Sequence, residues 1–363
     1  MDPISAPAGA VHDLSFLGLF LQADPIVKGV MILLVVASIA CWTVVFEKVV
    51  RLAKAKRQAK AFEALVRSGG SLDGKGTGIS AHVVAAGLDG TSTHPVSLLE
   101  APLDDAWMRD MGPSFVVGDD GRLGAVDWVF NGWGAQSWAT WAKDAAIAEK
   151  VAAAAAARVV GSPMVNEGGG FHVDGRGTAL VTRTVQLDPG RNPQMDEAGV
   201  EEELARTIGV RTCVWLPRGL TRDYDELGTR GHVDIVACFT PTGRVLLHWQ
   251  EDETHPDHAV SRQIEAVLAA AVDADGRPLE VVRIPAPVLT HDEGGQPVDW
   301  SYVNHLVCNG GIVACTFDDP NDERALAVLR EAYPDREVVG VDARPLYARG
   351  GGIHCITQQQ PAT

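Results

Sequence analysis

Residues 166–182 read NEGGGFHVDGRGTALVT, a short polar motif followed by two apolar runs with an Asp-Gly turn between them. The same order recurs in 109–130 (RDMGPSFVVGDDGRLGAVDWVF), 231–249 (GHVDIVACFTPTGRVLLHW) and 303–317 (VNHLVCNGGIVACTF). Each turn contains glycine, which adopts the positive φ angles that tight hairpins need. The sequence therefore predicts four β-hairpins, each introduced by polar residues.

Alanine-rich or charged stretches typical of helices separate these hairpins, at 142–158, 197–207, 258–272 and 321–332. The polar motifs recur every 51 to 72 residues, at Asp110, Glu167, His232, Asn304 and Cys355. A period of this size is typical of repeated β–β–α units, and we expect them to surround an axis like propeller blades. An ordinary α/β sandwich would fit the hairpins as well.

In such a ring the starts of the hairpins converge on the central channel, although they are far apart in the chain. Cys355 could then act as a thiolate nucleophile, with His232 as general acid and base and Glu167 orienting its ring. Asp110 and Asp234 add negative charge that suits a cation, and a guanidinium pairs with carboxylates through two parallel hydrogen bonds. These residue types together predict chemistry on a guanidinium group.

Other residues near these motifs have plausible roles in binding. Gly351 and Gly352, just before Cys355, would let the backbone approach a substrate closely, and Trp107 could pack on an alkyl chain. Each residue also has a structural alternative, such as a buried free thiol or a simple turn. The chain contains neither a Cys-x-x-Cys nor a His-Glu-x-x-His motif, so we expect no metal site.

The charge of the chain is unevenly distributed. The net charge is -16, which argues against a nucleic-acid partner. Residues 1–92 carry nine Lys/Arg and seven Asp/Glu, a net +2, whereas residues 93–363 carry -18. The two parts look like different kinds of protein.

The N-terminal part contains an uncharged apolar run, GVMILLVVASIACWTVVF at 29–46, followed by a basic stretch at 47–67. About 20 apolar residues cross a bilayer, so this run predicts one transmembrane helix, with a buried helix as the alternative. The basic flank places the N-terminus outside and the remainder in the cytoplasm. Residues 69–95, rich in Gly, Ser and Thr, read as a linker.

Two parts of the chain resemble known protein families. The stretch AVHDLSFLGLFLQADPIVKGVMILLVVASIACWTVVFEKVVRL, at 10–52, resembles the start of TolQ in the TolQ/ExbB/MotA family of proton-channel subunits, over about residues 1–90. The motifs AWMRDMGP, NEGGG, GTRGHVD and GGGIHCITQQQP, in this order, resemble agmatine deiminase of the guanidine-modifying (pentein) superfamily, over about residues 96–363.

The second resemblance implies a fivefold α/β propeller that hydrolyses agmatine to N-carbamoylputrescine and ammonia, a step in putrescine biosynthesis, with no cofactor. It implies that Cys355 attacks the guanidinium carbon and that Asp110 and Asp234 hold the guanidinium nitrogens. His232, held by Glu167, would protonate the departing ammonia and activate the hydrolytic water. Peptidyl-arginine or arginine deimination is the alternative activity, and a TolQ-like membrane adaptor without enzyme activity is a further alternative.

These interpretations divide the chain into a membrane anchor with its basic flank (1–68), a linker (69–95) and a cytoplasmic catalytic domain (96–363) held at the inner membrane. Members of the deiminase family begin with about ninety further residues that form much of the first blade. Because the membrane segment stands in their place, we expect an incomplete propeller with weak or no activity. The sequence leaves a homo-oligomer open.

Overall fold

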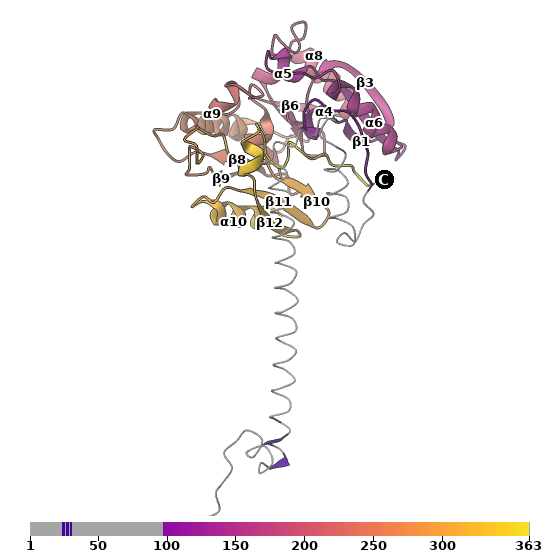
Figure 1. Ribbon diagram of the computed structural model, residues 1–363. Coiled ribbons are helices and arrows are strands. Elements are labelled where there is room, and N and C mark those ends of the chain that lie inside the picture. Colours follow the sequence, from indigo (N-terminus) through magenta and orange to yellow (C-terminus); the bar gives the residue numbers. More distant parts are fainter. Residues whose placement is uncertain (1–23, 26, 29, 31–96, 363) are drawn as a thin grey trace, which may run out of the picture. The chain divides into compact units, whose positions relative to one another are not determined.

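The computed structural model describes residues 97–362 and, near the N-terminus, residues 24, 25, 27, 28 and 30 (Figure 1). The chain divides into two compact units, Met1–Ala64 and Leu65–Thr363. The fold below is that of the second unit. No helix in the described part of the chain is long and apolar enough to cross a membrane. The span expected at 29–46 lies outside that part, apart from Val30, and so does the linker expected at 69–95.

Residues 97–362 contain four three-stranded sheets, each built from one continuous stretch of chain. The first two strands of each sheet form an antiparallel hairpin, as expected. The turn glycines Gly121, Gly175, Gly243 and Gly310 all have positive φ, between 71° and 85°. The hairpin strands are β1 (Ser114–Val117) and β2 (Leu123–Val129), β4 (Phe171–Val173) and β5 (Thr178–Thr182), β7 (Ala237–Phe239) and β8 (Val245–Trp249), and β10 (Leu306–Cys308) and β11 (Gly311–Thr316).

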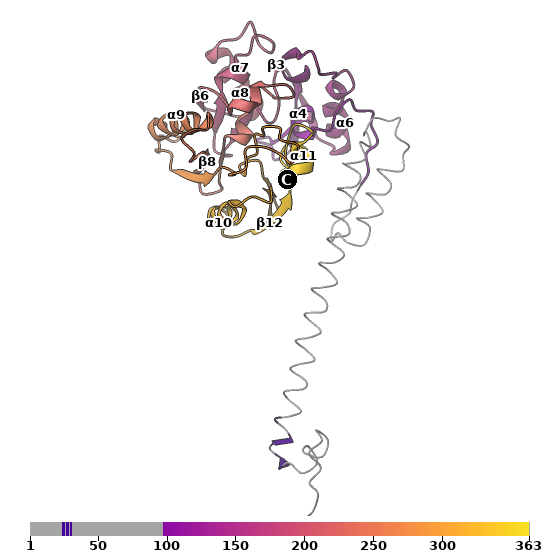
Figure 2. The ribbon, with the colours of Figure 1, turned by 60° about the vertical axis from the view of Figure 1, so that its left-hand side comes forward.

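A helix then crosses over to a third strand, which pairs in parallel with the second strand of the same hairpin. Parallel pairing requires such a crossover of a dozen or more residues, usually through a helix. Figures 1 and 2 show the four crossover helices around the outside of the sheets. They are α6 (Ile147–Ala154), α8 (Glu197–Ile208), α9 (Asp257–Ala270) and α10 (Asp322–Ala332), and they lead into β3 (Arg158–Val165), β6 (Thr212–Leu216), β9 (Val281–Pro285) and β12 (Glu337–Asp342).

The α/β class, the four hairpins and the four helices are therefore as the sequence predicted, but the repeat is β–β–α–β rather than β–β–α. The third strands are short apolar runs, such as TCVWL in β6. Periodicity cannot assign runs of this length on their own. Their pairing with the hairpin is what makes them strands.

The crossover helices also link one sheet to the next. Helix α8 packs on β3 of the preceding sheet, α9 on β6 and α10 on β9. Strand β12 is the third strand of the last sheet and so corresponds to β3, β6 and β9. Two of its valines are exposed, Val339 at 48% and Val341 at 41%. In the described residues we find no helix of a following unit that covers it.

Short helical segments join the repeats and carry several polar motifs. They are α4 (Met108–Met111), α5 (Gly132–Ala135), α7 (Arg183–Gln186), α11 (Arg344–Tyr347) and the 3₁₀ turns η1 (Asp144–Ala146), η2 (Thr221–Tyr224) and η3 (Val233–Ile235). Asp110 and Asp234 lie in two of these segments, and Cys355 lies in a turn after α11. The remaining motif residues, Glu167, His232 and Asn304, lie in loops that precede the first strand of a sheet.

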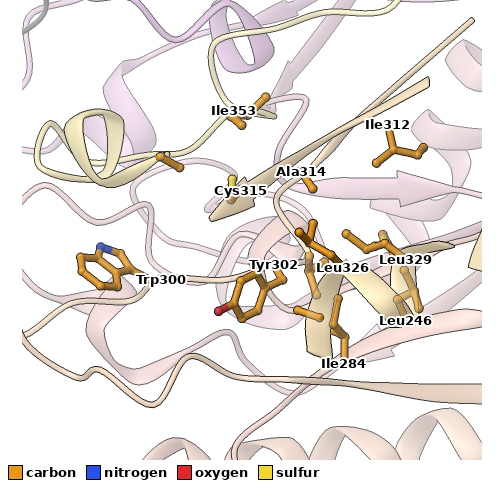
Figure 3. Close-up of a cluster of buried hydrophobic side chains, with 14 of the residues drawn as sticks. Leu246, Ile284, Trp300, Tyr302, Ile312, Ala314, Cys315, Leu326, Leu329 and Ile353 are labelled. Carbon is orange, nitrogen blue, oxygen red and sulfur yellow. The ribbon is translucent and has the colours of Figure 1, made fainter. Parts of the chain in front are cut away.

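A large apolar cluster fixes the loops at the C-terminal end of the chain (Figure 3). Trp300 and Ile353, from two loops, and Cys315, from β11, all belong to it and are buried. Burying side chains of this kind contributes about 1.5–3 kcal/mol each. The cluster therefore holds the 299–304 loop and the 350–355 loop in fixed positions, and both loops carry polar motifs.

Candidate active site

The structure brings the five predicted site residues together from four separate stretches of the chain, around positions 110, 167, 232–234 and 355. The His232 ring lies between two carboxylates, with Nδ1 3.8 Å from Asp110 Oδ1 and Nε2 3.5 Å from Glu167 Oε2. The Cys355 Sγ lies 3.8 Å from Asp234 Oδ2. The other four site residues are all at most 5% exposed: Asp110, Glu167, His232 and Asp234. Burial alone would favour the neutral form of each of these groups, so their charged forms depend on the opposite charges beside them.

The glycines after Glu167 make this close approach possible. A Cβ added at Gly169 would lie 2.5 Å from His232 Nδ1, and one at Gly168 would lie 2.2 Å from the backbone oxygen of Arg109. The N–H of Gly169 also donates to Asp110 Oδ1 at 3.0 Å. The Asn-Glu-Gly-Gly-Gly motif is therefore part of the site and more than a turn.

Glu167 is held in place by a buried arginine. Arg191 Nε donates to both carboxylate oxygens of Glu167 at 3.0 Å, and Arg191 Nη1 donates to Asp188 Oδ2 at 2.8 Å. Burial favours the neutral form of Glu167, but Arg191 and His232 outweigh it and keep the pKa of this carboxyl below its ordinary value. Glu167 therefore faces His232 as a carboxylate.

His232 is charged as a consequence. Burial lowers the pKa of an imidazole, yet the Asp110 carboxylate and Glu167 overcome this effect and raise the pKa of His232 to about 9. Its backbone is fixed by Asp223, whose Oδ2 accepts the N–H groups of Gly231 at 2.7 Å and His232 at 2.9 Å. The site thus holds an imidazolium in one orientation at neutral pH, which can serve as a general acid.

Asp110 is oriented by two donors. Its Oδ2 accepts from Trp133 Nε1 at 2.9 Å, and its Oδ1 accepts from Gly169. Burial raises the pKa of Asp110 to about 6, although His232 opposes the shift. The carboxylate form is therefore present at neutral pH, and both of its oxygens are held by these donors.

Asp234 and Cys355 share a second cluster with Asn304 and His354. Asp234 Oδ2 accepts from His354 Nδ1 at 2.7 Å and from Asn304 Nδ2 at 3.1 Å. Burial lowers the pKa of His354 well below its ordinary value, so the ring is neutral and donates through Nδ1–H. Asp234 Oδ1 is buried without a hydrogen-bond partner in the described part of the chain. A buried carboxylate oxygen of this kind is ready to accept a ligand donor.

The Cys355 thiol is partly buried and accepts from Asn304 Nδ2 at 3.3 Å. Burial raises the pKa of Cys355 well above its ordinary value, and the Asp234 and Asp110 carboxylates add to this effect. The two carboxylates would hold a cation beside the thiol. A bound cation would offset their repulsion of the thiolate and so favour its formation.

Trp107, Gly351 and Gly352 pack tightly beside the cysteine. A Cβ on Gly351 would lie 2.7 Å from Trp107 Cζ3 and 3.1 Å from Cys355 Cβ, and one on Gly352 would lie 2.3 Å from Asn304 Oδ1. The backbone N–H of Arg109 also donates to the oxygen of Cys355 at 2.9 Å. The glycines are therefore required for close packing around the thiol.

The sequence analysis assigned no role in the site to several residues that the structure places there. Asn304 occupies a position of the motif period, but nothing in the sequence indicated its contact with the thiol. Arg191, His354 and Trp133 act through tertiary contacts with no regular spacing. All three nevertheless lie in stretches that resemble the deiminase family, His354 in GGGIHCITQQQP, Trp133 in VDWVFNGWGAQ and Arg191 in QLDPGRNPQ.

Fold and site together define an α/β enzyme with a cysteine, an imidazolium and carboxylates arranged for a small cation. The chain belongs to the Porphyromonas-type peptidyl-arginine deiminase family, whose model matches residues 34–361. It is 57% identical over 268 residues to a Streptomyces coelicolor protein named "Putative agmatine deiminase", a match that covers 74% of this chain and 79% of that one. It is 41% identical over 288 residues to the agmatine deiminase of Stutzerimonas stutzeri, with 74% and 77% covered.

Solved structures agree with this assignment. The agmatine deiminase of Enterococcus faecalis superposes with a TM-score of 0.68 at 34% identity, covering 73% of this chain and 77% of that chain. A Campylobacter jejuni agmatine deiminase, at 23% identity and a TM-score of 0.65, shares the fold and covers 76% of this chain and 79% of that one. The fold is of the α/β pentein type.

These matches lend no support to the TolQ-like interpretation of residues 1–90. The family match begins at residue 34, inside the run interpreted as a membrane span. An apolar run of 18 residues is at the short end for crossing a bilayer, and its composition is compatible with a buried helix as well. The TolQ resemblance rested on sequence similarity within this apolar run and the residues on either side of it.

Proposed function

We propose that the protein hydrolyses the guanidinium group of agmatine to N-carbamoylputrescine and ammonia, a step suited to putrescine synthesis. The observation that carries the proposal is a pair of buried carboxylates, Asp110 beside the His232 imidazolium and Asp234 beside the Cys355 thiol. Guanidinium N–H groups would donate to these carboxylates, and one acceptor there, Asp234 Oδ1, is buried and unpartnered within the described residues. The names of the relatives favour agmatine over an arginine side chain.

The reaction follows from the arrangement of charges. Binding of the cationic guanidinium lowers the cost of ionising Cys355, whose proton leaves to solvent, and the thiolate attacks the guanidinium carbon. His232, charged below about pH 9, donates its proton to the departing nitrogen, and ammonia leaves. The former guanidinium carbon, now an amidine carbon, remains covalently bonded to Cys355 Sγ.

Water then completes the turnover. The neutral His232 takes a proton from a water molecule, whose oxygen attacks the amidine carbon, and the C–S bond breaks to restore the thiolate and the imidazolium. Glu167, fixed by Arg191, keeps the ring oriented through both steps. Trp107 would pack on the alkyl chain of the substrate, and Gly351 and Gly352 would let the backbone approach it.

The arrangement of the four sheets supports a further proposal, that they are four of the five blades of a pentein propeller. The uncovered face of β12 is where a fifth unit would pack. We also keep the domain division at 1–68, 69–95 and 96–363, and a membrane anchor at 29–46, as proposals. Fractionation of cells with and without detergent tests the anchor, since release of the protein by buffer alone would contradict it.

Agmatine-dependent ammonia release tests the activity. The purified chain should release ammonia in proportion to agmatine consumed, and Cys355→Ala should abolish the release while the protein stays folded by circular dichroism. A folded wild-type protein that releases no ammonia at saturating agmatine would overturn the proposal. Free arginine and an arginine peptide, run in parallel, distinguish the alternative substrates.

A further inference from the structure

Arg109 is a buried cation that forms no ion pair in the part of the chain that the structure describes. It lies in α4 next to Asp110 and is only 7% exposed. Its Nε donates to the backbone oxygen of His354 at 3.3 Å. Its Nη1 and Nη2 donate to the side-chain oxygens of Gln358 and Gln359. Buried arginines are usually paired with a carboxylate, so a guanidinium held only by neutral oxygens keeps an uncancelled charge.

The acceptors of this guanidinium all belong to residues 354–359, the segment that contains the nucleophile. The backbone N–H of Arg109 also donates to the oxygen of Cys355 at 2.9 Å. Gln358 Nε2 donates to the oxygen of Pro113 at 2.8 Å, which leaves its side-chain oxygen for the guanidinium. Two of the three consecutive glutamines at 358–360 thus serve as neutral acceptors for Arg109, a role that the steps of hydrolysis do not explain.

Arg109 is charged at neutral pH. Burial lowers the pKa of its guanidinium to about 10, and the negative charges of Asp234, Asp110 and the Cys355 thiolate oppose this shift. Electrostatic stabilisation is mutual, so the guanidinium in turn favours the ionised forms of these three groups.

The other charged groups near the thiol act against its ionisation or are already paired. Asp234 and Asp110 repel a thiolate and raise the pKa of Cys355 further above the value that burial gives it. The His232 imidazolium lies between Asp110 and Glu167, so its charge is offset by two carboxylates.

The remaining titratable groups beside the thiol are neutral. Burial holds the pKa of His354 well below its ordinary value, so its ring carries no charge. Burial raises the pKa of Tyr347 well above its ordinary value, so its hydroxyl also stays neutral. Among the described residues around Cys355, Arg109 therefore provides the permanent positive charge that no carboxylate contacts.

We propose that Arg109 is a positioning residue for the nucleophile, which fixes the 354–359 segment through its donors and favours the Cys355 thiolate through its charge. A guanidinium substrate would add a second positive charge on the side of Asp110 and Asp234. Arg109 is present before the substrate arrives, so it lowers the cost of ionisation in the free protein as well. The inference rests on the proposed function only for the role of Cys355 as nucleophile.

The pH dependence of Cys355 alkylation tests this role without substrate. Iodoacetamide is neutral and reacts with the thiolate, and mass spectrometry of the peptide that contains Cys355 separates its reaction from that of the other cysteines. Arg109→Met removes the charge and should raise the midpoint of the profile by about one pH unit, so that alkylation below the midpoint slows about tenfold. Arg109→Lys keeps the charge, and its midpoint should lie closer to that of the wild type.

A substitution at Gln359 separates the charge of Arg109 from its hydrogen bonds. Gln359→Glu keeps an acceptor for Nη2, but the new carboxylate would pair with the guanidinium and offset its charge. The midpoint should therefore rise although the contact is retained. Gln360→Glu is the matched control, because the next residue is exposed and forms no hydrogen bond within the described residues, and it should shift the midpoint less.

Higher midpoints in Arg109→Met and Gln359→Glu, with Arg109→Lys and Gln360→Glu near the wild type, support the inference. A wild-type midpoint in Gln359→Glu, or an equal rise in Gln360→Glu, overturns the effect of charge. If Arg109→Met does not fold, Gln359→Glu alone decides between these outcomes. Alkylation requires no agmatine, so shifted midpoints stand even if the wild-type protein releases no ammonia, and only the proposed hydrolysis then falls.

Discussion

Arg191 Nε lies 3.0 Å from both carboxylate oxygens of Glu167, and both side chains are fully buried. Removing one partner of such a pair leaves an uncompensated buried charge, which costs about 3–5 kcal/mol. We therefore expect Arg191→Met to lower the free energy of unfolding by about this amount in urea titrations. The variant should also lose activity, because Glu167 would no longer be held beside His232.

An exposed pair provides the control for this prediction. Arg324 contacts Glu251 at 2.7 Å, but both side chains are more than half exposed. Exposed pairs contribute roughly 0–1 kcal/mol, so Arg324→Met should have little effect on the urea midpoint. Equal losses in the two arginine variants would contradict a structural role for the buried pair.

Gly169→Ala should damage the site with little change in the fold. The added methyl group would lie 2.5 Å from His232 Nδ1 and 2.9 Å from Asp110 Oδ1, so one of these side chains must move. Displacement of a catalytic group by about 1 Å can cost on the order of a hundredfold in rate, and we expect a loss of kcat/KM of about this size. Gly161→Ala, where no atom lies within 4 Å of the added carbon, is the control and should retain activity.

The charge on His232 predicts how stability depends on pH. Its folded pKa, about 9, is above the ordinary value of an imidazole, so the folded state binds the proton more tightly than the unfolded state does. The resulting stability is fully present below the unfolded pKa, roughly 6.5, and is lost as pH rises through about 9. Asp110, Glu167 and Asp234 are the charged groups that produce this shift.

The difference in unfolding free energy between wild type and His232→Gln isolates this contribution from other titrating groups. We expect the advantage of the wild type to be constant below about pH 6.5 and to shrink between there and pH 9. Nuclear magnetic resonance of the His232 ring should give a midpoint near the upper end of this range. A midpoint at the ordinary histidine value would show that the two carboxylates do not hold the proton.

The sequence could predict the local elements because their signals are local. The turn glycines Gly121, Gly175, Gly243 and Gly310 indicated the hairpins, and the structure places each of them at positive φ. The third strands were missed because a run such as TCVWL becomes a strand only through its pairing with β5. Pairing between segments separated by a helix leaves no periodic signal within either segment.

The same distinction applies to the site. Asp110, Glu167, His232 and Cys355 recur at a regular spacing, so the sequence could group them before any contact was known. Arg191, His354 and Trp133 support that group through contacts that depend on the packed fold, and their spacing carries no information. The N-terminal interpretation rested on the apolar run at 29–46, its basic flank and a resemblance to TolQ, and an apolar run of this length does not by itself separate a membrane span from a buried helix.

The exposed face of β12 leads to the last prediction. A helix of the next sheet packs on each of the equivalent strands β3, β6 and β9, although Val159 on β3 is still 44% exposed. Among the helices of the described residues, strand β12 packs only on its own crossover helix α10, and its Val339 and Val341 are 48% and 41% exposed. Exposed apolar strands promote association between copies of a protein. The double variant Val339→Thr, Val341→Thr should therefore lower light scattering of the purified chain at high concentration, with the free energy of unfolding changed by no more than about 0.5 kcal/mol.

The control is Val214→Thr on β6, a strand that helix α9 covers. Val214 is 5% exposed, so a hydroxyl there would be buried and should destabilise the fold by about 1–3 kcal/mol without reducing association. Scattering that is unchanged in the double variant would mean that β12 is covered in the intact chain. In that case another part of the chain or another copy already covers this face of β12. Limited proteolysis of the same sample should then show that β12 is protected to the same degree as β6.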